Sequence, residues 1–399
     1  MSDALLGYAA CRQRLESLLL AGQPLWRPQP FKQETPLWAE RQPEFAERLL
    51  GLDEAVVDRI EADPFALIEL VQGEWPELAE LRPCIDLPMH AADACNAVSP
   101  HRLRDIPGRK QEQIRYFAAA IGEPLAPLLE WCAGKGHLGR ILAHQHGLDV
   151  LSLEIDPDLC RGGLQLAARD RIADRHGFIC ADALNAESSR RCRGRHALAL
   201  HACGELHRRL VRNVVETGCP ALDLAPCCYY RGVDSTYQAF MPSVLKLTVD
   251  DLRLAVTQTV TASTAQRRRS RQAQAWKLAW VALANTLRGS SDWRAFRPVP
   301  DVWYRHGFGG FIERMARREG LGLPARIDLA AFEAEGWRRA ARMRRFGLVR
   351  HAFRRPLELW LAHDMAAYLE SHGYRIHLAA FCPQHITPRN IHLAARRLA

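Results

Sequence analysis

Apolar and polar residues follow two different periods along the chain, and the changes between them divide it into parts. Over residues 1–108, apolar residues recur at helical spacing, as in Leu5–Leu20, Leu49–Ile60 and Pro64–Gln72. Such spacing predicts short amphipathic helices, here interrupted by Pro and Trp. We therefore expect an N-terminal helical region that carries no motif with recognisable chemistry.

The pattern changes at residues 107–108. A predicted amphipathic helix over Arg109–Ile121 is followed by short β-type runs that alternate with helical ones. The predicted strands cover residues 128–131, 150–155, 178–180, 197–201 and 221–224. The predicted helices between them cover residues 137–146, 158–170 and 205–217. This alternation is typical of an α/β domain with a parallel sheet and helices on both faces.

The alternation stops after Tyr230 and returns near the end of the chain. A helix is predicted over Leu357–Ser371, and strands over Tyr374–Phe381 and Ile391–Ala395. The stretch between contains apolar helical patterns and reads as an insert in the sheet domain. The four predicted parts are residues 1–108, the helical region; 109–233, the first part of the sheet domain; 234–355, a basic and mostly helical insert; and 356–399, the last helix and two strands.

Positive charge is concentrated in one of these parts. The chain has a net charge of +9, yet residues 264–355 alone hold 20 Arg and 1 Lys against 7 Asp and Glu. Two interpretations stay open: a solvated, arginine-rich face, or a surface for a polyanion such as RNA. The dense run Arg267, Arg268, Arg269 and Arg271 is the candidate for phosphate contacts. Rows such as Arg338, Arg342 and Arg345 would lie on one helix face.

The remaining composition indicates a globular chain in a reducing compartment. Its 12 cysteines are scattered without the spacing of a disulfide framework. No run approaches the roughly 20 apolar residues of a membrane helix. Residues 1–20 lack the basic start and cleavage site of a secretory signal. We expect a cytoplasmic protein without a membrane partner; its oligomeric state does not follow from the pattern.

A glycine loop stands between the first predicted strand and the next helix. In Glu130-Trp131-Cys132-Ala133-Gly134-Lys135-Gly136-His137-Leu138-Gly139, the glycines allow a tight turn and a close approach of backbone to ligand. The spacing also matches the dinucleotide fingerprint, which three glycines can meet by chance.

Three acids distinguish between the cofactors that such a loop binds. Glu154 ends the second predicted strand, where a carboxylate accepts from ribose hydroxyls, and Asp182 follows the third. Glu130 ends the first, where a buried acid requires a cationic or hydrogen-bonding partner. An ammonium supplies such a partner and a pyrophosphate would be repelled. The three acids together favour S-adenosylmethionine over NAD.

At this point the chain resembles a known family. The loop Glu130–Gly139, the runs Leu200–Gly204 and Pro226–Tyr230, and the late Thr387–Asn390 are similar to the class-I methyltransferase domain of the eukaryotic methyltransferase-like and glutathione S-transferase C-terminal domain-containing proteins. More distantly they resemble tRNA 2′-O-methyltransferases. The resemblance covers about 107–233 and 356–399. It implies a Rossmann-like sheet of seven strands whose last two form an antiparallel pair.

The resemblance also implies a set of cofactor contacts. These would come from Glu130, Cys132, Gly134, Gly136, Glu154, Asp182, His201 and Cys203. One departure stands out: the tRNA enzymes carry Cys-Cys-His-His where this chain has Cys227-Cys228-Tyr229-Tyr230. That difference leaves the substrate open.

Candidate chemistry gathers at the ends of the fourth and fifth predicted strands. His201 is placed to accept a proton from an attacking nucleophile, or to be a hydrogen-bonded structural histidine. Cys227 is either a thiolate nucleophile, as in RNA cytosine-C5 methyltransferases, or a buried structural thiol, which we favour. Tyr229 and Tyr230 are candidates for stacking on a base.

Two further features complete the predicted site. Arg389 and Asn390, in the last turn, either face substrate or cap the final strand. The cysteines show no C-x2-C or H-x3-H spacing, so no metal site is predicted.

We therefore predict an S-adenosylmethionine-dependent methyltransferase acting on RNA, either tRNA or rRNA. Three alternatives remain: a methyltransferase acting on a protein of the translation machinery, a non-catalytic RNA-binding scaffold of the same fold, and an NAD-linked oxidoreductase, which Glu130 disfavours.

Overall fold

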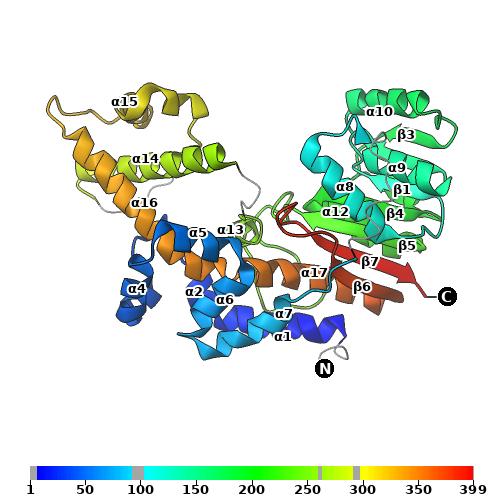
Figure 1. Ribbon diagram of the computed structural model, residues 1–399, viewed down its shortest axis with the longest axis horizontal. Helices are drawn as coiled ribbons and strands as arrows, with labels where there is room; N and C mark the ends of the chain where they lie inside the picture. The colour runs from blue at the N-terminus through cyan, green and yellow to red at the C-terminus, as the bar shows by residue number, and fades with distance from the viewer. Residues whose placement is uncertain (1–6, 92–102, 259–262, 291–296, 399) are drawn as a thin grey trace. The chain divides into compact units, whose positions relative to one another are not determined.

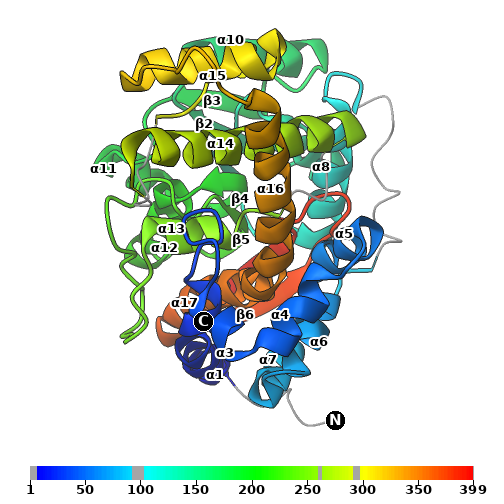
Figure 2. The same ribbon diagram turned by 90° about the vertical axis from the view of Figure 1, so that its left-hand side faces the viewer.

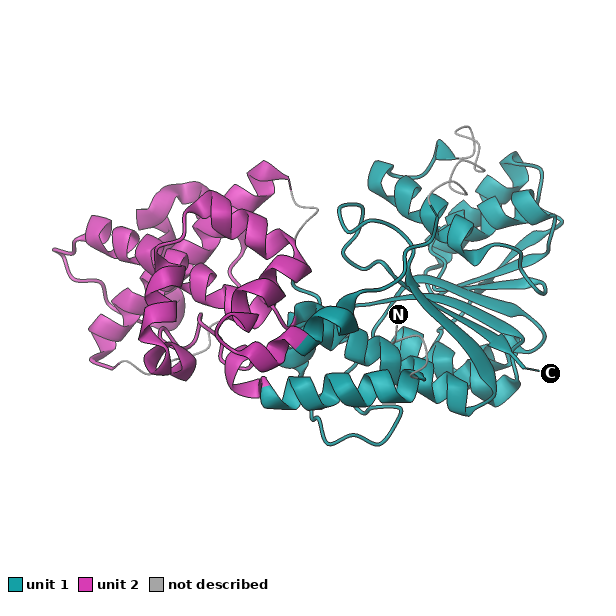
Figure 3. Ribbon diagram, turned by 60° about the horizontal axis from the view of Figure 1, so that its bottom comes forward, with its two compact units in different colours: residues 1–21, 80–261, 354–399 teal, residues 22–79, 262–353 magenta. Residues whose placement is uncertain are grey.

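The computed structural model describes residues 7–91, 103–258, 263–290 and 297–398. The chain folds into two compact units (Figure 3). Unit 1 comprises residues 1–21, 80–261 and 354–399, and unit 2 comprises residues 22–79 and 262–353. This division differs from the four predicted parts, because the N-terminal region contributes to both units.

Unit 1 is built on a seven-stranded sheet in the order β3-β2-β1-β4-β5-β7-β6 (Figure 1). The first five strands run parallel, and β7 is antiparallel to both of its neighbours, β5 and β6. The strands are β1 (Leu128–Trp131), β2 (Val150–Glu154), β3 (His176–Cys180), β4 (His196–Cys203), β5 (Ala221–Cys227), β6 (Tyr374–Ala380) and β7 (Ile391–Arg397). The predicted α/β class and the antiparallel pair at the end of the chain are confirmed.

Helices flank this sheet, as the alternating pattern predicted. Helix α9 contacts β1, β2 and β3, α12 contacts β4 and β5, and α17 contacts β6 and β7. The helices of unit 1 are α1 (Tyr8–Ala21), α7 (Leu81–Ile85), α8 (Gly108–Ile121), α9 (His137–His146), α10 (Pro157–Arg169), α11 (Ala186–Ser189), α12 (Glu205–Thr217), α13 (Val249–Leu254) and α17 (Arg354–Ser371), with a 3-10 turn at Arg190–Cys192. Every residue of β5 is buried, and all but Asp223 are apolar or proline, as expected for a central strand covered on both faces.

A buried carboxylate links three neighbouring strands. Asp223 of β5 accepts hydrogen bonds from His196 of β4 and from His392 and Arg396 of β7, the last two at 2.7 and 2.9 Å. These donors hold the pKa of Asp223 well below its usual range despite complete burial. A buried charge is tolerated only with such partners, so the contact specifies the place of β7 beside β5.

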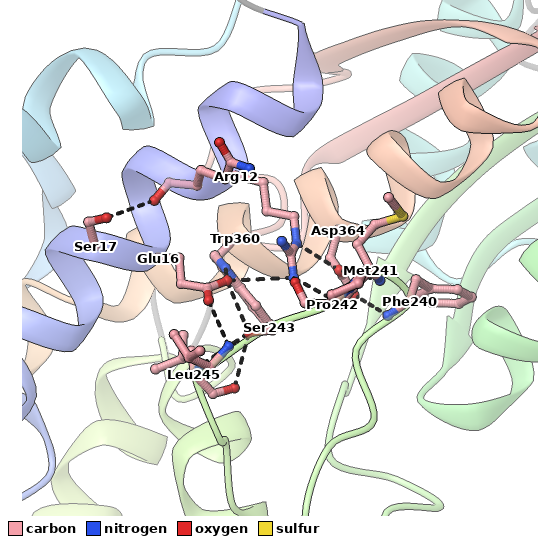
Figure 4. A network of polar contacts seen from close by, with 12 residues as sticks. Arg12, Glu16, Ser17, Phe240, Met241, Pro242, Ser243, Leu245, Trp360 and Asp364 are labelled. Carbon is pink, nitrogen blue, oxygen red and sulfur yellow. Dashed lines mark hydrogen bonds and ion pairs between the residues drawn. The ribbon is translucent and has the colours of Figure 1, made fainter.

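Helix α1 belongs to unit 1 because buried polar contacts join it to α17 (Figure 4). Arg12 Nε donates to Asp364 Oδ1 at 2.8 Å, and its Nη2 donates to the carbonyl oxygens of Met241 and Pro242. Glu16 Oε2 accepts from Ser243 Oγ at 3.0 Å. Residues 240–243, within the predicted insert, are thereby attached to the sheet domain.

Unit 2 consists of helices. They are α2 (Gln23–Trp26), α3 (Leu37–Arg41), α4 (Pro43–Leu50), α5 (Glu54–Ala62), α6 (Pro64–Gln72), α14 (Thr264–Arg288), α15 (Gly307–Glu319) and α16 (Leu329–His351), with 3-10 turns at Pro76–Glu80, which runs one residue into unit 1, and Asp301–His306. The single helix expected over Leu49–Ile60 is two helices. Helix α4 ends before Gly51, and Asp53 is the N-cap of α5.

Helices α14 and α16 cross closely within unit 2 (Figure 2). A Cβ atom at Gly336 of α16 would lie 2.4 Å from the Ala275 carbonyl oxygen, so only glycine allows this approach. Aromatic side chains including Trp276 and Phe311 fill the neighbouring core. In the described part of the chain, no helix has the length and apolar character that crossing a bilayer requires.

Candidate active site

The loop between β1 and α9 has the backbone that its glycines predict. Cys132, Gly134 and Gly136 adopt positive φ values of 55°, 60° and 64°. A Cβ atom at Gly136 would lie 2.6 Å from the Phe178 ring, so glycine is needed there for packing. A Cβ atom at Gly134 would meet no atom within 4 Å. The loop therefore packs firmly at Gly136 and leaves open space at Gly134.

Glu154 ends β2 beside this loop. Its Oε2 accepts from Gly134 N at 2.8 Å, and its Oε1 accepts from Ile155 N at 2.9 Å and Asp156 N at 3.1 Å. These three amides hold the half-buried carboxylate in one orientation. The structure thus brings the second predicted acid into direct contact with the glycine loop.

Asp182 follows β3 and is exposed. Its Oδ1 accepts from Leu184 N at 2.9 Å, which fixes the turn after the strand. Because β1, β2 and β3 are parallel neighbours, their carboxyl ends lie at one edge of the sheet. Gly134, Glu154 and Asp182 share this edge, which is where ligands bind in open α/β sheets.

Glu130 lies at the end of β1, but its carboxylate is turned into the protein. Only 5% of the residue is exposed, and Oε2 accepts from Gly139 N at 3.1 Å and Ser152 Oγ at 2.8 Å. Burial raises its pKa to about 7. The predicted contact with a cofactor ammonium is replaced by protein donors, and Glu130 supports the loop from beneath.

The ends of β4 and β5 bring the next set of predicted residues together. A bulge between Leu200 and Cys203 interrupts the register of β4 against β5. Cys203 Sγ lies 3.3 Å from Cys227 Sγ. His201 and Cys228 adopt positive φ values of 64° and 43°, which are rare outside glycine. Backbone strain of this kind concentrates at functional sites.

His201 has the properties of a neutral base. Its Nε2 donates to Gln113 Oε1 of α8 at 3.2 Å, which leaves Nδ1 without a proton and without a partner. Burial lowers its pKa to about 4, so the ring is uncharged at neutral pH. Sequence reasoning missed Gln113, because only the packing of α8 shows which residue of that helix faces β4.

The two tyrosines after the cysteines differ in exposure. Tyr229 is 1% exposed and lies edge-on to His207, with 5.4 Å between ring centroids. It is a core residue, and the predicted stacking of Tyr229 on a base is wrong because no face of its ring is accessible. Tyr230 is half-buried, and the guanidinium of Arg253 lies 5.4 Å from its ring centroid.

The two late candidates have structural contacts. Arg389 Nη1 donates to the Ala255 carbonyl oxygen at 3.0 Å and to Glu358 Oε1 at 3.2 Å. Asn390 is 2% exposed and donates from Nδ2 to the Cys382 carbonyl oxygen at 2.7 Å. The predicted substrate contact of Asn390 is therefore wrong, and Arg389 faces Glu358 of α17.

The basic residues of unit 2 divide into paired and unpaired groups. On α16, Arg344 contacts Glu54, Asp58 and Glu61, and Arg345 contacts Glu54. Arg342 contacts Glu34, Arg338 contacts Glu335, and Arg271 of α14 contacts Asp58. The arginine row expected on one solvent face is thus largely neutralised by acids, most of them from residues 22–79.

Arg267, Arg268 and Arg269 differ from that group. All three are exposed in the first turns of α14, and none has an ion-pair partner among the described residues. Gln266 uses its side chain to close the capping box with Ser263, so the helix begins just before them. Of the predicted phosphate contacts, these three remain available.

A family comparison assigns an enzyme class to the first part of the sheet domain. Residues 109–232 match the family model described as a methyltransferase domain. No curated protein matches the chain. Similar solved structures include an RNA methyltransferase from Salinibacter ruber in complex with S-adenosylhomocysteine, which is 21% identical at a TM-score of 0.26 and covers 33% of this chain and 86% of its own.

Two further similar solved structures come from other organisms. An rRNA methylase from Streptococcus thermophilus is 14% identical at a TM-score of 0.24, with 36% of this chain and 92% of its own covered. A putative sarcosine dimethylglycine methyltransferase from Galdieria sulphuraria is 11% identical at a TM-score of 0.28, with 78% and 90% covered. Likenesses this low carry no substrate information, so the enzyme class rests on the family match.

Proposed function

We propose that this S-adenosylmethionine-dependent methyltransferase acts on RNA in the cytoplasm. The observation that carries the proposal is the run of three exposed arginines, Arg267 to Arg269, which have no ion-pair partner among the described residues, whereas Arg271 of the same helix and the arginines of α16 from 338 to 345 contact acids. Arginine binds phosphate with a planar fork of donors, and free guanidinium groups are what a polyanion requires.

The sheet edge suits the cofactor that this domain uses. Open space at Gly134 admits a ligand close to the backbone, and Glu154 and Asp182 offer carboxylate oxygens to hydroxyl and amino groups of a nucleoside. When bound, S-adenosylmethionine supplies a methyl group on a positively charged sulfur.

The cofactor assignment predicts that Glu154→Ala weakens S-adenosylhomocysteine binding at least tenfold. Isothermal titration calorimetry measures this, with Glu187→Ala of the exposed α11 as a control that removes an equal charge. Binding of NADH in place of S-adenosylhomocysteine would contradict the assignment. Unchanged affinity of the Glu154 variant would exclude its contact with the ligand.

The ends of β4 and β5 suit the acceptor. Tyr230 with Arg253 and the exposed Arg231 provide an aromatic face within a cationic surface, which matches a nucleotide. His201 Nδ1 is buried, neutral and unpartnered, and a hydroxyl or amine that reached it could give it the proton lost as its lone pair bonds to the methyl carbon. These residues orient the acceptor and remove its proton.

The substrate class is tested by incubating the enzyme and tritiated S-adenosylmethionine with total RNA and total protein from a strain lacking the gene. We expect label in RNA. Label in protein alone would favour a methyltransferase of a translation component, and no label in either would favour a non-catalytic scaffold.

The arginine surface is tested by replacing Arg267, Arg268 and Arg269 with Ala together. We expect RNA affinity to fall at least tenfold at 0.1 M salt and the slope of log affinity against log salt to decrease by about 0.9 per lost phosphate contact. The control replaces Arg305, Arg317 and Arg326 with Ala. These arginines are exposed in the same unit, and their replacement removes the same charge. Equal losses in the two triple variants would contradict a specific surface.

A further inference from the structure

Three thiols meet at the carboxyl ends of two neighbouring strands. Cys203 ends β4, Cys227 ends β5, and Cys228 follows directly. Their sulfur atoms all lie within 4.8 Å of one another, and the Cys203 and Cys227 sulfurs are 3.3 Å apart. Cys203 and Cys227 are also direct partners in the strand register. Neighbouring strands therefore hold two of the three sulfurs face to face.

The local backbone departs from ordinary geometry where these thiols meet. The bulge in β4 restores the pairing of Cys203 with Cys227, and Cys228 needs a positive φ to place its side chain beside them. Gly204 allows the chain after Cys203 to touch the next turn, since a Cβ atom there would lie 2.0 Å from the Arg231 carbonyl oxygen. A left-handed backbone is unfavourable for a residue with a Cβ atom, so the surrounding fold must hold this arrangement in place.

We propose that Cys203, Cys227 and Cys228 form a binding site for a thiophilic divalent cation, Zn²⁺ in the cell. Three sulfur donors select zinc over the oxygen-preferring Mg²⁺ and Ca²⁺. Tetrahedral coordination with Zn–S bonds of about 2.3 Å places ligand sulfurs about 3.8 Å apart. The Cys203 and Cys227 sulfurs are 3.3 Å apart and no pair of the three is separated by more than 4.8 Å, so small side-chain rotations satisfy the geometry.

The fourth coordination position falls to solvent or to the methyl acceptor. No histidine or carboxylate in the described chain joins the set of sulfurs within 4.8 Å. Three protein ligands with an open fourth position are the arrangement of catalytic rather than structural zinc sites. Binding releases the three thiol protons to solvent and leaves the site with one net negative charge. The positive charges of Arg231 and Arg389 act on Cys228 and offset this net negative charge of the site.

Sequence spacing predicted no metal here because it considers ligands within one loop. These ligands come from two strands, and 24 positions separate Cys203 from Cys227. The inference concerns the acceptor end of the sheet and holds whether or not RNA is the substrate.

The test uses Co²⁺ as a spectroscopic probe of the full-length protein, reduced with a phosphine and freed of metal by a chelator. We expect one equivalent of Co²⁺ to bind, with thiolate-to-metal charge-transfer absorption and the intense visible bands of tetrahedral cobalt, and one equivalent of Zn²⁺ to remove both. Cys203→Ser and Cys228→Ser should lose these bands. Cys180→Ser, which removes an exposed free thiol outside the cluster, should keep them.

A second measurement needs no variant. Alkylation of the folded protein, followed by peptide mass spectrometry, should show Cys228 protected by stoichiometric Zn²⁺ while Cys180 reacts at an unchanged rate. Absence of cobalt charge-transfer bands in the reduced protein would overturn the proposal, as would bands that persist in Cys228→Ser or equal labelling of Cys228 with and without zinc. A Cys203–Cys227 disulfide that forms again after reduction, in the presence of Zn²⁺, would also overturn it.

Discussion

Glu130 lies beneath the glycine loop, where Gly139 N and Ser152 Oγ donate to its carboxylate. Ser152 Oγ is also 2.8 Å from His176 Nε2, so β1, β2 and β3 share one buried polar chain. A charge removed from water in this way is costly unless donors compensate it fully. The loop therefore rests on a group that changes its protonation near neutral pH.

The burial of Glu130 makes the free energy of unfolding depend on pH. Burial raises the Glu130 pKa from 4.5 to about 7, so the folded protein binds more protons than the unfolded chain between those values. The free energy of unfolding that Glu130 contributes must then fall as pH rises through this window. Glu130→Gln should gain about 2–3 kcal/mol relative to the wild type between pH 5 and pH 8, as measured by urea unfolding. A difference that stays constant with pH would contradict the assignment.

Helix α1 is joined to the sheet domain by a contact between elements far apart in sequence. The Asp364 carboxylate of α17 accepts hydrogen bonds from Arg12 Nε, from Phe240 N at 2.7 Å and from Met241 N at 3.1 Å (Figure 4). One carboxylate therefore links α1, α17 and the segment 240–241. The side chains of Arg12 and Asp364 are 5% and 0% exposed. Removing the Asp364 charge breaks this buried pair and leaves Arg12 with Glu16, 3.5 Å from its Nη2, as its remaining acidic partner.

Asp364→Asn should therefore lower the free energy of unfolding by about 3–5 kcal/mol. Its amide group would offer a donor to backbone amides that need an acceptor. Chemical denaturation of the full chain measures the effect. The control is Glu187→Gln in the exposed Glu187–Arg190 pair, which should change the free energy of unfolding by less than about 1 kcal/mol. Similar effects of the two variants would show that the Arg12–Asp364 contact does not hold α1.

At the scale of the whole molecule, acidic and basic residues are concentrated in different segments of the chain. Residues 22–79 hold 12 acidic and 5 basic residues, whereas residues 262–353 hold 18 Arg and 1 Lys against 7 acids. Within unit 2 these segments pair, as the contacts of Arg344 and Arg345 show. RNA affinity is therefore expected to depend on the few free guanidinium groups and not on total basicity.

Unit 1 contains histidines that are neutral because they are buried. The pKa is lowered to about 4 in His90, His137, His176, His201, His207 and His363. The unfolded chain takes up these protons below about pH 6.5, so the stability they contribute is present above that pH and lost toward pH 4. We expect the unfolding temperature to fall steeply between pH 6.5 and pH 4.5.

His363 isolates one such contribution, because it lies on α17 away from the predicted ligand contacts. His363→Leu should reduce the loss of unfolding free energy over that pH range by up to about 3 kcal/mol. Parallel pH dependences of the variant and the wild type would rule out this origin of acid sensitivity.

Local patterns were enough for much of the fold. Helix α6 begins and ends at the predicted residues, and β1 and α12 do as well. The prediction of a single helix over residues 49–60 was wrong because apolar spacing continues through Gly51, where the chain turns. Periodicity reports which face of a segment is buried, and it does not report where the chain breaks within a face.

Local sequence patterns were sufficient to predict the strand–helix alternation, the glycine loop and the acids at the ends of β2 and β3, because each depends on residues within one turn or strand. The burial of Tyr229, the ion pairs of Arg344 and Arg345, and the convergence of three thiols became evident only from the packing of the folded chain. Those outcomes depend on partners tens to hundreds of residues away. Which side chains meet across such separations follows from how strands and helices pack, and no local pattern encodes it.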